Sequence, residues 1–434
     1  MRPGTTPGKV RAVRERSLGS SHREGAVSGV LAFVLAGGRG QRLYPLTRDR
    51  AKPAVPFAGL YRIIDFTLTN CLHSGLRHIL VLTQYKSLSL ERHIQIGWSI
   101  FSPALGEFLI TVPPQQRTAE RWYLGTADAI YQNLYSVERF TMERGAPEAI
   151  LILAGDHVYK MDYRPMVRFH QEREADLTVG VVAVPLAEAA EKLGVLVVNG
   201  EGGVLQFQEK PAQPAPSPGD PAVCLASMGI YVFRPEVLAR RLEEDAQIAD
   251  SSHDFGRDII NRMVGEDRVF AFPFERANKN PLPYWRDVGT LDAYWEAHMD
   301  LVAITPKFNL YDREWPIHTY HEPWPPAKTV HDEPDRTGTA VNSLLSPGSI
   351  VSGSHVVRSV LSPGVRVNSY ATIEDSVLLA EVDVGRGAKI RRAVVDKGVR
   401  IPPGEKIGYD LEADRARFTV TEAGIVVLPK EARF

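Results

Sequence analysis

The chain has 434 residues, of which 44% are hydrophobic and 24% charged, and its formal net charge is −1. This composition is ordinary for a globular protein of two or three domains. The near-zero charge provides no global field that would attract nucleic acid or an anionic membrane. The sequence also has no run of about 18 apolar residues, the length that a bilayer span needs. We therefore expect neither nucleic acid nor a membrane as a partner.

The first 28 residues differ from the rest of the chain. They carry six basic residues against Glu15 and Glu24, with glycine and serine between them. No apolar core of a secretory signal follows, and the two acids disfavour an organellar transit peptide. We expect residues 1–28 to form a disordered N-terminal extension.

From Val30 onward, apolar strand-like segments alternate with helix-like segments. Between the second and third of these strands, residues 127–140 place Ile130, Leu134 and Val137 on one stripe, which predicts an amphipathic helix. The alternation favours an open α/β sheet. The predicted strands are 30–36, 78–85, 149–157 and 176–184.

The first strand runs into a glycine-rich segment, VLAGGRGQRLYPLTRDRAKPAV at 34–55. A P-loop would need lysine where Gln41 stands, and a dinucleotide fingerprint would need glycine where Leu43 stands. A more general phosphate site remains, in which glycine amides approach phosphate oxygens and Arg39 and Lys52 neutralise them. The alternative is a tight turn with solvated arginines.

Two acidic residues strengthen the phosphate interpretation. Asp156 ends an apolar strand, where open α/β sheets bind ligands, and Asp287 lies in the aromatic segment YWRDVGT. Together they could hold Mg²⁺ on a nucleotide, although each alone could be a cap or turn residue. Lys210 in FQEKPA suits a sugar phosphate, with an ordinary surface lysine as the alternative. We interpret His157 as structural rather than as a base.

The last hundred residues change period. Apolar residues recur every 17 positions in four registers, and within each repeat they fall six apart, which is typical of a hexapeptide β-helix. A sandwich of short strands is the alternative. Residues 306–334, rich in Pro, Trp, Tyr and His, are predicted to be a packed linker. The registers are 350/367/384/401, 356/373/390/407, 365/382/399 and 360/377/394.

Several motifs together resemble the sugar-1-phosphate nucleotidyltransferases, and among them the bacterial glucose-1-phosphate adenylyltransferase family. The resemblance runs from about residue 30 to the C-terminus. It implies a Rossmann-like (GT-A-like) nucleotidyltransferase domain at 29–305 and a left-handed parallel β-helix at 335–434 for regulation and oligomerisation. The motifs are LAGGRGQRLYPLT, RAKPAV, RIIDF, WYLGTADAIYQN, LAGDHVYKMDY, LASMGIYVF, SSHDFGRDII, PYWRDVGTLDAYW and PPAK.

The resemblance also implies a reaction and its residues. ATP and α-D-glucose 1-phosphate would give ADP-glucose and pyrophosphate with Mg²⁺ as cofactor, the committed step of glycogen synthesis. The implied catalytic residues are Arg39, Lys52, Asp156 and Asp287, with the metal on the two aspartates. The implied ATP-binding residues are Gly37, Gly38, Arg39, Gln116, Gly125 and Thr126. The implied glucose 1-phosphate residues are Tyr123, Gly194, Glu209, Lys210 and Ser227.

By the same resemblance we expect a cytoplasmic homotetramer, activated by a glycolytic intermediate and inhibited by AMP or phosphate. Two cysteines, Cys71 and Cys224, are too few for a disulfide framework or a metal cluster and fit a reducing compartment. The implied effector positions are Arg50, Arg62, Arg139, Glu381 and Lys397.

The sequence departs from one branch of the resembled family. Members activated by fructose 1,6-bisphosphate carry lysine where this chain has Asp49 and histidine where it has Pro56. Loss of a cation at 49 weakens a bisphosphate site, so we predict that a monophosphate such as fructose 6-phosphate, or an α-keto acid such as pyruvate, is the main activator.

Three other functions remain as alternatives. The first is a sugar-1-phosphate nucleotidyltransferase that uses another nucleoside triphosphate. The second is a non-catalytic regulatory homologue, which the simultaneous presence of Arg39, Lys52, Asp156, Lys210 and Asp287 disfavours. The third is an acyltransferase, which is disfavoured because the β-helix offers only His355 as a base.

Overall fold

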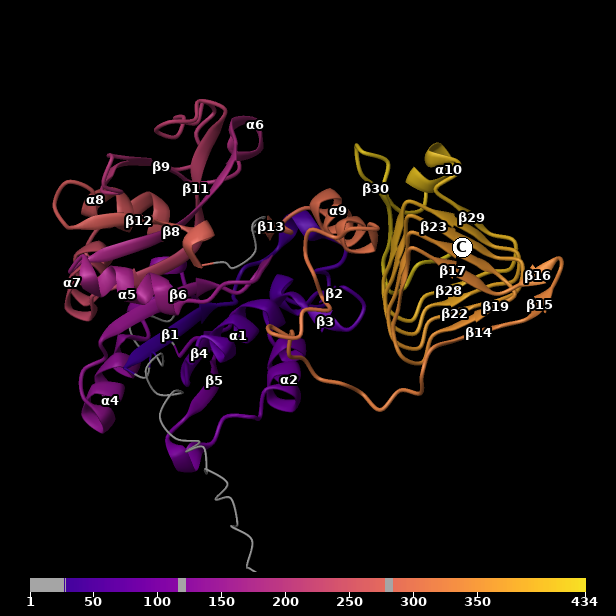
Figure 1. Cartoon of the computed structure of the whole chain (residues 1–434), viewed down its shortest axis with the longest axis horizontal. Coiled ribbons are helices and arrows are strands. Elements are labelled where there is room, and N and C mark those ends of the chain that lie inside the picture. The colour runs from indigo at the N-terminus through magenta and orange to yellow at the C-terminus, as the bar shows by residue number, and fades with distance from the viewer. Residues whose placement is uncertain (1–26, 28, 116–121, 278–283) are drawn as a thin grey trace, which may run out of the picture.

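The computed structural model describes residues 27, 29–115, 122–277 and 284–434. Figure 1 shows a mixed α/β body that runs to helix α9 (Leu291–Val302) and a β-helix beside it. The predicted N-terminal extension, apart from Val27, lies outside the described residues. Both halves of the predicted fold class are confirmed: a nucleotidyltransferase-type α/β domain and a left-handed β-helix.

The α/β body is built on a nine-stranded mixed sheet in the order β10-β9-β11-β6-β1-β4-β5, with β8 paired to β11 and β12 paired to β8. Strands β6, β1, β4 and β5 are parallel, whereas β11 is antiparallel to β6. The strands are β1 (Val30–Leu35), β4 (His78–Leu82), β5 (Phe108–Val112), β6 (Ala149–Ala154), β8 (Leu177–Pro185), β9 (Val195–Val198), β10 (Val204–Gln208), β11 (Val223–Phe233) and β12 (Val269–Pro273).

Both faces of the central strands are buried, which explains their unbroken apolar sequences. In β1, Ala32 and Val34 join one core cluster, and Leu31 and Phe33 join another on the opposite face. Helices α1, α2 and α5 contribute to the first cluster, and α3, α4 and α7 to the second. The helices are α1 (Ile63–His73), α2 (Leu88–Gly97), α3 (Thr126–Tyr131), α4 (Leu134–Arg144), α5 (Arg164–Glu172), α6 (Leu186–Ala189), α7 (Pro235–Ala246), α8 (Asn261–Met263), α9 (Leu291–Val302) and α10 (Leu411–Arg415).

The predicted helix 127–140 is two helices, α3 and α4, separated at Gln132 and Asn133. The Asn133 amide donates to the Ala129 carbonyl and to the Tyr123 hydroxyl. Such a side-chain bond to the backbone competes with helical bonding, and the apolar stripe continues across the break. The predicted apolar stripe is therefore confirmed, but the prediction of one continuous helix is wrong.

The β-helix has three parallel sheets, and its interior is filled by a separate apolar cluster. One sheet comprises β14 (Lys328–Val330), β19 (Ile350–Ser352), β22 (Arg366–Val367), β25 (Asp383–Val384) and β28 (Arg400–Ile401). The second comprises β17 (Thr339–Val341), β20 (His355–Val357), β23 (Thr372–Glu374), β26 (Lys389–Arg391) and β29 (Lys406–Ile407). The third comprises β18 (Leu344–Leu345), β21 (Val360–Leu361), β24 (Val377–Leu378), β27 (Ala393–Val395), β31 (Val426–Leu428) and the antiparallel β30 (Thr419–Val420).

One predicted repeat register is wrong by one residue. Val351, not Ile350, pairs with Val367 and is fully buried, so this coil has 16 residues in that register while the next two have 17. A one-residue slip reverses which side chain faces the interior, and two adjacent apolar residues hide the slip in the sequence. The registers through Val356 and Val360 are confirmed.

The segment predicted as a linker packs against both parts. Trp315 stacks on His73 at 4.6 Å and donates to Asn70, and Trp324 lies over the turn glycines Gly348 and Gly364. The segment already contains β14, the first strand of the β-helix.

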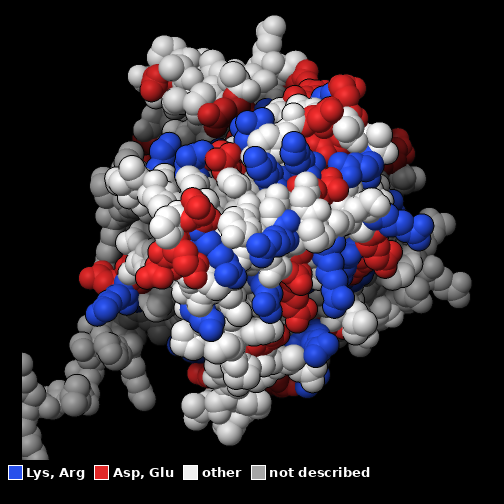
Figure 2. Space-filling model, turned by 90° about the vertical axis from the view of Figure 1, so that its right-hand side faces the viewer, with Lys and Arg blue, Asp and Glu red and all other residues white. Residues whose placement is uncertain are grey.

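The outer face of the β-helix carries Lys and Arg interspersed with Asp and Glu (Figure 2). No helix within the described ranges is long and apolar enough to cross a membrane.

Helix α9 joins the two parts. Tyr294, Ala297 and Leu301 share one apolar cluster with Val377 and Val394 of the β-helix. The same helix continues from β13 (Trp285–Asp287), which pairs with β7 (His157–Tyr159). A single short stretch of chain therefore connects the β-helix surface to the carboxyl edge of the main sheet.

Candidate active site

The candidate site lies at the carboxyl edge of β1 and β6. These strands run parallel with Leu35 opposite Ala154, so the glycine segment after β1 and Asp156 after β6 emerge side by side. The carboxyl edge of an open α/β sheet is its usual ligand-binding edge. The predicted strand 149–157 therefore ends at Ala154, and Asp156 stands on the turn before β7.

Lys52 forms the centre of the site. Its Nζ lies 2.9 Å from Asp156 Oδ2 and 2.8 Å from Asp287 Oδ1, although 235 residues separate Lys52 and Asp287 in sequence. Burial lowers the pKa of Lys52, but the Asp156 and Asp287 carboxylates raise it by more than burial lowers it. The pKa of Lys52 therefore lies above its ordinary value. Lys52 is therefore a fixed cation between two carboxylates.

Local packing fixes the backbone that carries Lys52. Lys52–Ala54 form a 3-10 turn with Pro53 at its start. Gly40 has φ +60°, and a β-carbon there would lie 2.9 Å from Lys52 Cβ. Only glycine tolerates both the left-handed conformation and this close approach, which explains the third glycine of the segment. Thr47 Oγ1 donates to the Gly40 carbonyl at 2.9 Å and closes the loop.

Asp156, His157 and Asp287 form a group that could hold a metal ion. One ligand atom from each lies within 4.8 Å of the others, and β7 and β13 place His157 opposite Asp287. Burial raises the pKa of Asp156, while Lys52 and His157 lower it more, to about 2. Carboxylate oxygens are the donors that Mg²⁺ prefers, so the two aspartates of the group fit the expected cation. His157 Nδ1 is buried without a hydrogen-bond partner among the described residues.

The glycine segment presents an open surface beside this group. Gly38 is exposed, and a β-carbon there would meet nothing within 4 Å. Arg39 is exposed and makes no hydrogen bond or ion pair with the described residues. Gly37 lies against Gln84, whose amide donates to the Tyr123 carbonyl at 3.1 Å. Backbone amides and a free guanidinium therefore lie next to the carboxylates, as phosphate recognition requires.

The predicted adenine-side residues lie at the start of α3. A β-carbon on Gly125 would lie 2.2 Å from the His253 carbonyl oxygen, so the close approach of residues 252–253 requires glycine. Thr126 Oγ1 donates to Asp254 and accepts from the Phe255 amide, both at 3.0 Å. The SSHDFGRDII motif thus holds this corner in place. Gln116 lies outside the described residues.

The predicted sugar-side residues gather on the neighbouring antiparallel strands. The Ser227 amide donates to the Gly194 carbonyl at 2.8 Å, and a β-carbon on Gly194 would lie 3.3 Å from Glu209 Oε2. Glu209 Oε1 pairs with Lys210 Nζ at 3.0 Å. Strand β11, which carries Ser227, borders the carboxylate group, because a β-carbon on its Gly229 would lie 3.6 Å from the His157 ring.

Tyr123, the remaining sugar-side prediction, is buried under α3. Its hydroxyl accepts from Asn133 at 3.0 Å, and burial raises the pKa of the phenol. The side chain therefore supports the wall of the site through its backbone and ring, with its hydroxyl already bonded.

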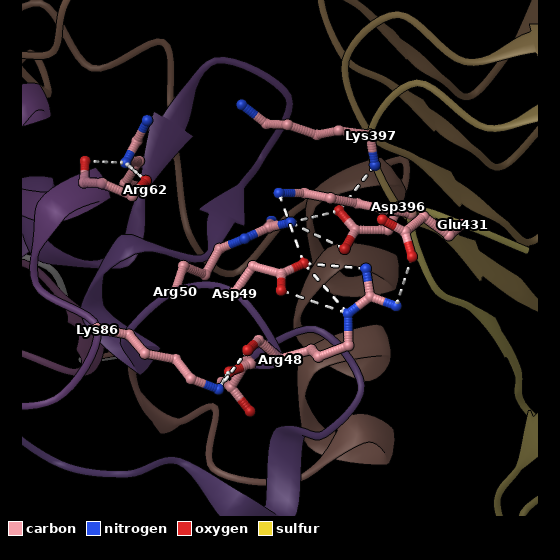
Figure 3. Close-up of polar contacts among 11 residues, drawn as sticks. Arg48, Asp49, Arg50, Arg62, Lys86, Asp396, Lys397 and Glu431 are labelled. Atoms are coloured by element: carbon pink, nitrogen blue, oxygen red, sulfur yellow. Dashed lines mark hydrogen bonds and ion pairs between the residues drawn. The ribbon is translucent and has the colours of Figure 1, made fainter.

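Three predicted effector residues meet between the α/β body and the β-helix (Figure 3). Arg50 Nη2 lies 2.7 and 2.8 Å from the Asp396 carboxylate oxygens, and both side chains are buried. Arg62 donates to Ser89 at 2.7 Å, and burial lowers its pKa to about 10. Burial, Arg62 and Arg50 lower the pKa of Lys397 to about 8. Arg62 and Lys397 line a cavity of about 110 Å³ between the two parts, which we call the interdomain cavity.

The other effector predictions are placed differently. Glu381 is exposed at a β-helix corner, directly after Ala380, which lines the interdomain cavity. Arg139 lies on α4, at the far side of the α/β body from the β-helix, and pairs with Glu143 at 2.7 Å (Figure 1). Within one chain, Arg139 therefore does not join the interdomain group. Asp49 pairs with Arg48 at 3.0 Å, which lowers the pKa of the carboxyl.

Sequence reasoning missed some residues that the structure brings into or behind the site. His157 was interpreted as structural but joins the carboxylates; its position next to Asp156 was the available signal. Arg42 approaches Asp287 at 3.9 Å from the glycine segment itself. Asp396 was not singled out, and its distance of 346 residues from Arg50 left no local signal.

Comparisons with known proteins agree with this geometry. Residues 31–303 match the family described as "Nucleotidyl transferase", and residues 325–428 match "GlmU-like, C-terminal hexapeptide". Over 92% of its length the chain is 54%, 53% and 51% identical to proteins of Rhodopirellula baltica, Methylococcus capsulatus and Koribacter versatilis. The matches cover 90%, 92% and 95% of those proteins, each named glucose-1-phosphate adenylyltransferase. The chain belongs to the glucose-1-phosphate adenylyltransferase family of nucleotidyl transferases.

Proposed function

We propose that this chain transfers the adenylyl group of ATP to α-D-glucose 1-phosphate, giving ADP-glucose and pyrophosphate. The observation that carries the proposal is the contact of Lys52 with both Asp156 and Asp287, beside an open glycine segment and a separate sugar-side group. The names of relatives that are 51–54% identical to this chain support the choice of ATP and glucose 1-phosphate.

In the proposed reaction, an oxygen of the sugar phosphate attacks the α-phosphorus in line with the leaving pyrophosphate. The protein contributes position and charge rather than covalent chemistry. The amides of Gly37 and Gly38 and the Arg39 guanidinium hold the triphosphate, while Lys210 binds the sugar phosphate. Lys52 stabilises the charge that develops at the α-phosphate, because it is the buried cation nearest both aspartates.

Asp156 and Asp287, with His157 beside them, would hold Mg²⁺. Such an ion neutralises phosphate charge and orients the oxygens for in-line displacement. Lys52 contacts one oxygen of each carboxylate, so its ammonium and the ion would share these two residues as ligands.

We further propose that the enzyme serves glycogen synthesis as a cytoplasmic homotetramer regulated by anionic metabolites. Arg62 and Lys397, which line the interdomain cavity, would bind the effector, with Arg50 behind them in its buried pair with Asp396. The place of Arg139 in regulation stays a prediction. The negative charge of Asp49, next to Arg50, supports a monophosphate or an α-keto acid over fructose 1,6-bisphosphate as activator. An effector panel in which fructose 1,6-bisphosphate gives the largest activation would overturn that choice.

The test of the reaction is pyrophosphate release with glucose 1-phosphate and ATP, UTP, GTP or dTTP in turn. We expect ATP to give the highest kcat/KM. Asp156→Asn should abolish turnover with an unchanged circular dichroism spectrum, because a charged metal ligand is lost. A higher kcat/KM with another nucleotide would replace the proposed substrate, and turnover in Asp156→Asn equal to that of the native chain would remove the proposed site.

A further inference from the structure

We propose that Asp396, a β-helix residue remote from the substrates, is a positioning residue for Lys52 and acts through Arg50. The inference rests on the proposed function, because it assigns to Lys52 the contact with ATP. It means that the active site of the α/β body is completed by an ion pair with the other domain.

The first observation is the geometry of the pair. Arg50 places one nitrogen 2.7 and 2.8 Å from the two oxygens of Asp396, and the two side chains are only 4% and 3% exposed. Asp396 Oδ1 also accepts from the Lys397 amide at 2.7 Å, which fixes the carboxylate to its own turn after β27. A buried pair of this kind holds its partners in one place, whereas an exposed pair would not.

The second observation is the short, tightly packed connection from Arg50 to Lys52. Only Ala51 separates them, and it is fully buried. Lys52 begins the 3-10 turn that contains Pro53, and Gly40 packs against its β-carbon. A shift of Arg50 cannot be absorbed by a flexible segment here, so it reaches Lys52.

The third observation is that, within the described ranges, Asp396 is the carboxylate that hydrogen-bonds to Arg50, whereas Asp49 acts on it only at longer range. Arg50 Nη1 is buried and has no hydrogen-bond partner among those residues. Arg62 and Lys397 both lie close enough to contribute repulsion in this region, as the lowered pKa of Lys397 shows. Without the Asp396 charge, a buried arginine would face two further cations, and the favourable response is movement of Arg50 toward solvent.

Figure 3 shows Arg50 and Asp396 facing each other across the boundary, with Arg48 and Asp49 forming a second pair beside them. That second pair is more exposed than the first. At the other end of the same short segment, Lys52 contacts a different pair of carboxylates, Asp156 and Asp287. A carboxylate on the β-helix thus holds one end of the segment, and the metal-site carboxylates hold the other.

The test is a double-mutant cycle on ATP binding, measured by isothermal titration calorimetry with Mg²⁺ in the full-length protein. We expect Asp396→Asn, which keeps the size and one acceptor oxygen, to raise the Kd for ATP about tenfold. The matched control is Asp375→Asn, which breaks a bidentate but exposed Arg–Asp pair with Arg358 on the same β-helix. We expect the control to change the Kd by less than about twofold.

The decisive comparison uses the Lys52→Ala background. If Asp396 acts through Lys52, Asp396→Asn changes the Kd there by less than about twofold, because the group it positions is already gone. A tenfold loss that persists in that background would assign Asp396 a general structural role and overturn the proposal, as would an unchanged Kd in the single variant. If Asp396→Asn does not fold, Arg50→Lys replaces it in the cycle with the same expectations. A native protein that binds no ATP would refute the proposed function itself.

Discussion

Replacing Lys52 with methionine should separate two proposed effects of its charge. One is stabilisation of the reacting phosphate, and the other is competition with a metal ion for the Asp156 and Asp287 carboxylates. The ammonium lies 2.8–2.9 Å from one oxygen of each aspartate, and the donor atoms of the metal group lie within 4.8 Å of one another. At an effective dielectric constant of about 20, two unit charges about 4 Å apart interact by about 4 kcal/mol. Asp156 and Asp287 are 33% and 23% exposed, and solvent screening reduces this to about 1.4 kcal/mol, or about tenfold in affinity.

We therefore expect Lys52→Met to bind Mn²⁺ about tenfold more tightly than the native chain when no nucleotide is present, because a competing cation has been removed. The same variant should lose about 100-fold or more in kcat, since a preorganised charge at the phosphate is lost. Mn²⁺ affinity is measured by electron paramagnetic resonance at pH 7. The control is Lys160→Met, which removes a lysine paired with Asp312 outside the metal group. Weaker or unchanged Mn²⁺ binding in Lys52→Met would refute the reasoning.

Three further predictions concern the sugar side, the adenine side and the interdomain cavity. Lys210→Ala should raise the KM for glucose 1-phosphate by about tenfold to 100-fold and leave that for ATP unchanged in steady-state kinetics; a rise in the ATP value would show the assignment to be wrong. Gly125→Ala should lower the Tm by several degrees, because its β-carbon would lie 2.2 Å from the His253 carbonyl, whereas Gly200→Ala, which faces open space, should not. Lys397 has a pKa of about 8, and an anionic effector favours its charged form, so activation constants should rise from pH 7 to pH 9; a flat profile in the native chain would contradict the role of Lys397.

The fold was predictable because its patterns are local and repeated. Apolar strands buried on both faces and a 17-residue period each recur several times, so single irregularities do not hide them. The errors came from single residues. Asn133 ends α3 through side-chain bonds, and Ile350 and Val351 are both apolar, so nothing in the sequence reveals which of them faces inward.

The site was predictable only in part. Asp156 follows a strand and Lys52 follows the glycine segment, so the topology alone predicts that they converge. Asp287 was singled out by its aromatic segment, but no local pattern predicts that it meets Asp156, because its position depends on the pairing of β13 with β7. Neither the strand topology nor the family resemblance predicted the role of Asp396. Its ion pair crosses the domain boundary, so it depends on how two surfaces dock and not on any spacing along the chain.

Transfer of the adenylyl group of ATP, which contains the α-phosphorus, is tested most directly by following a radiolabel. ATP labelled at the α-phosphorus or at the γ-phosphorus is incubated with the enzyme, Mg²⁺ and glucose 1-phosphate, and the products are separated by chromatography. We expect the α label to appear in ADP-glucose and the γ label in pyrophosphate, and we expect Asp156→Asn to form neither product. Transfer of the γ label to the sugar, or its release as orthophosphate, would contradict the account.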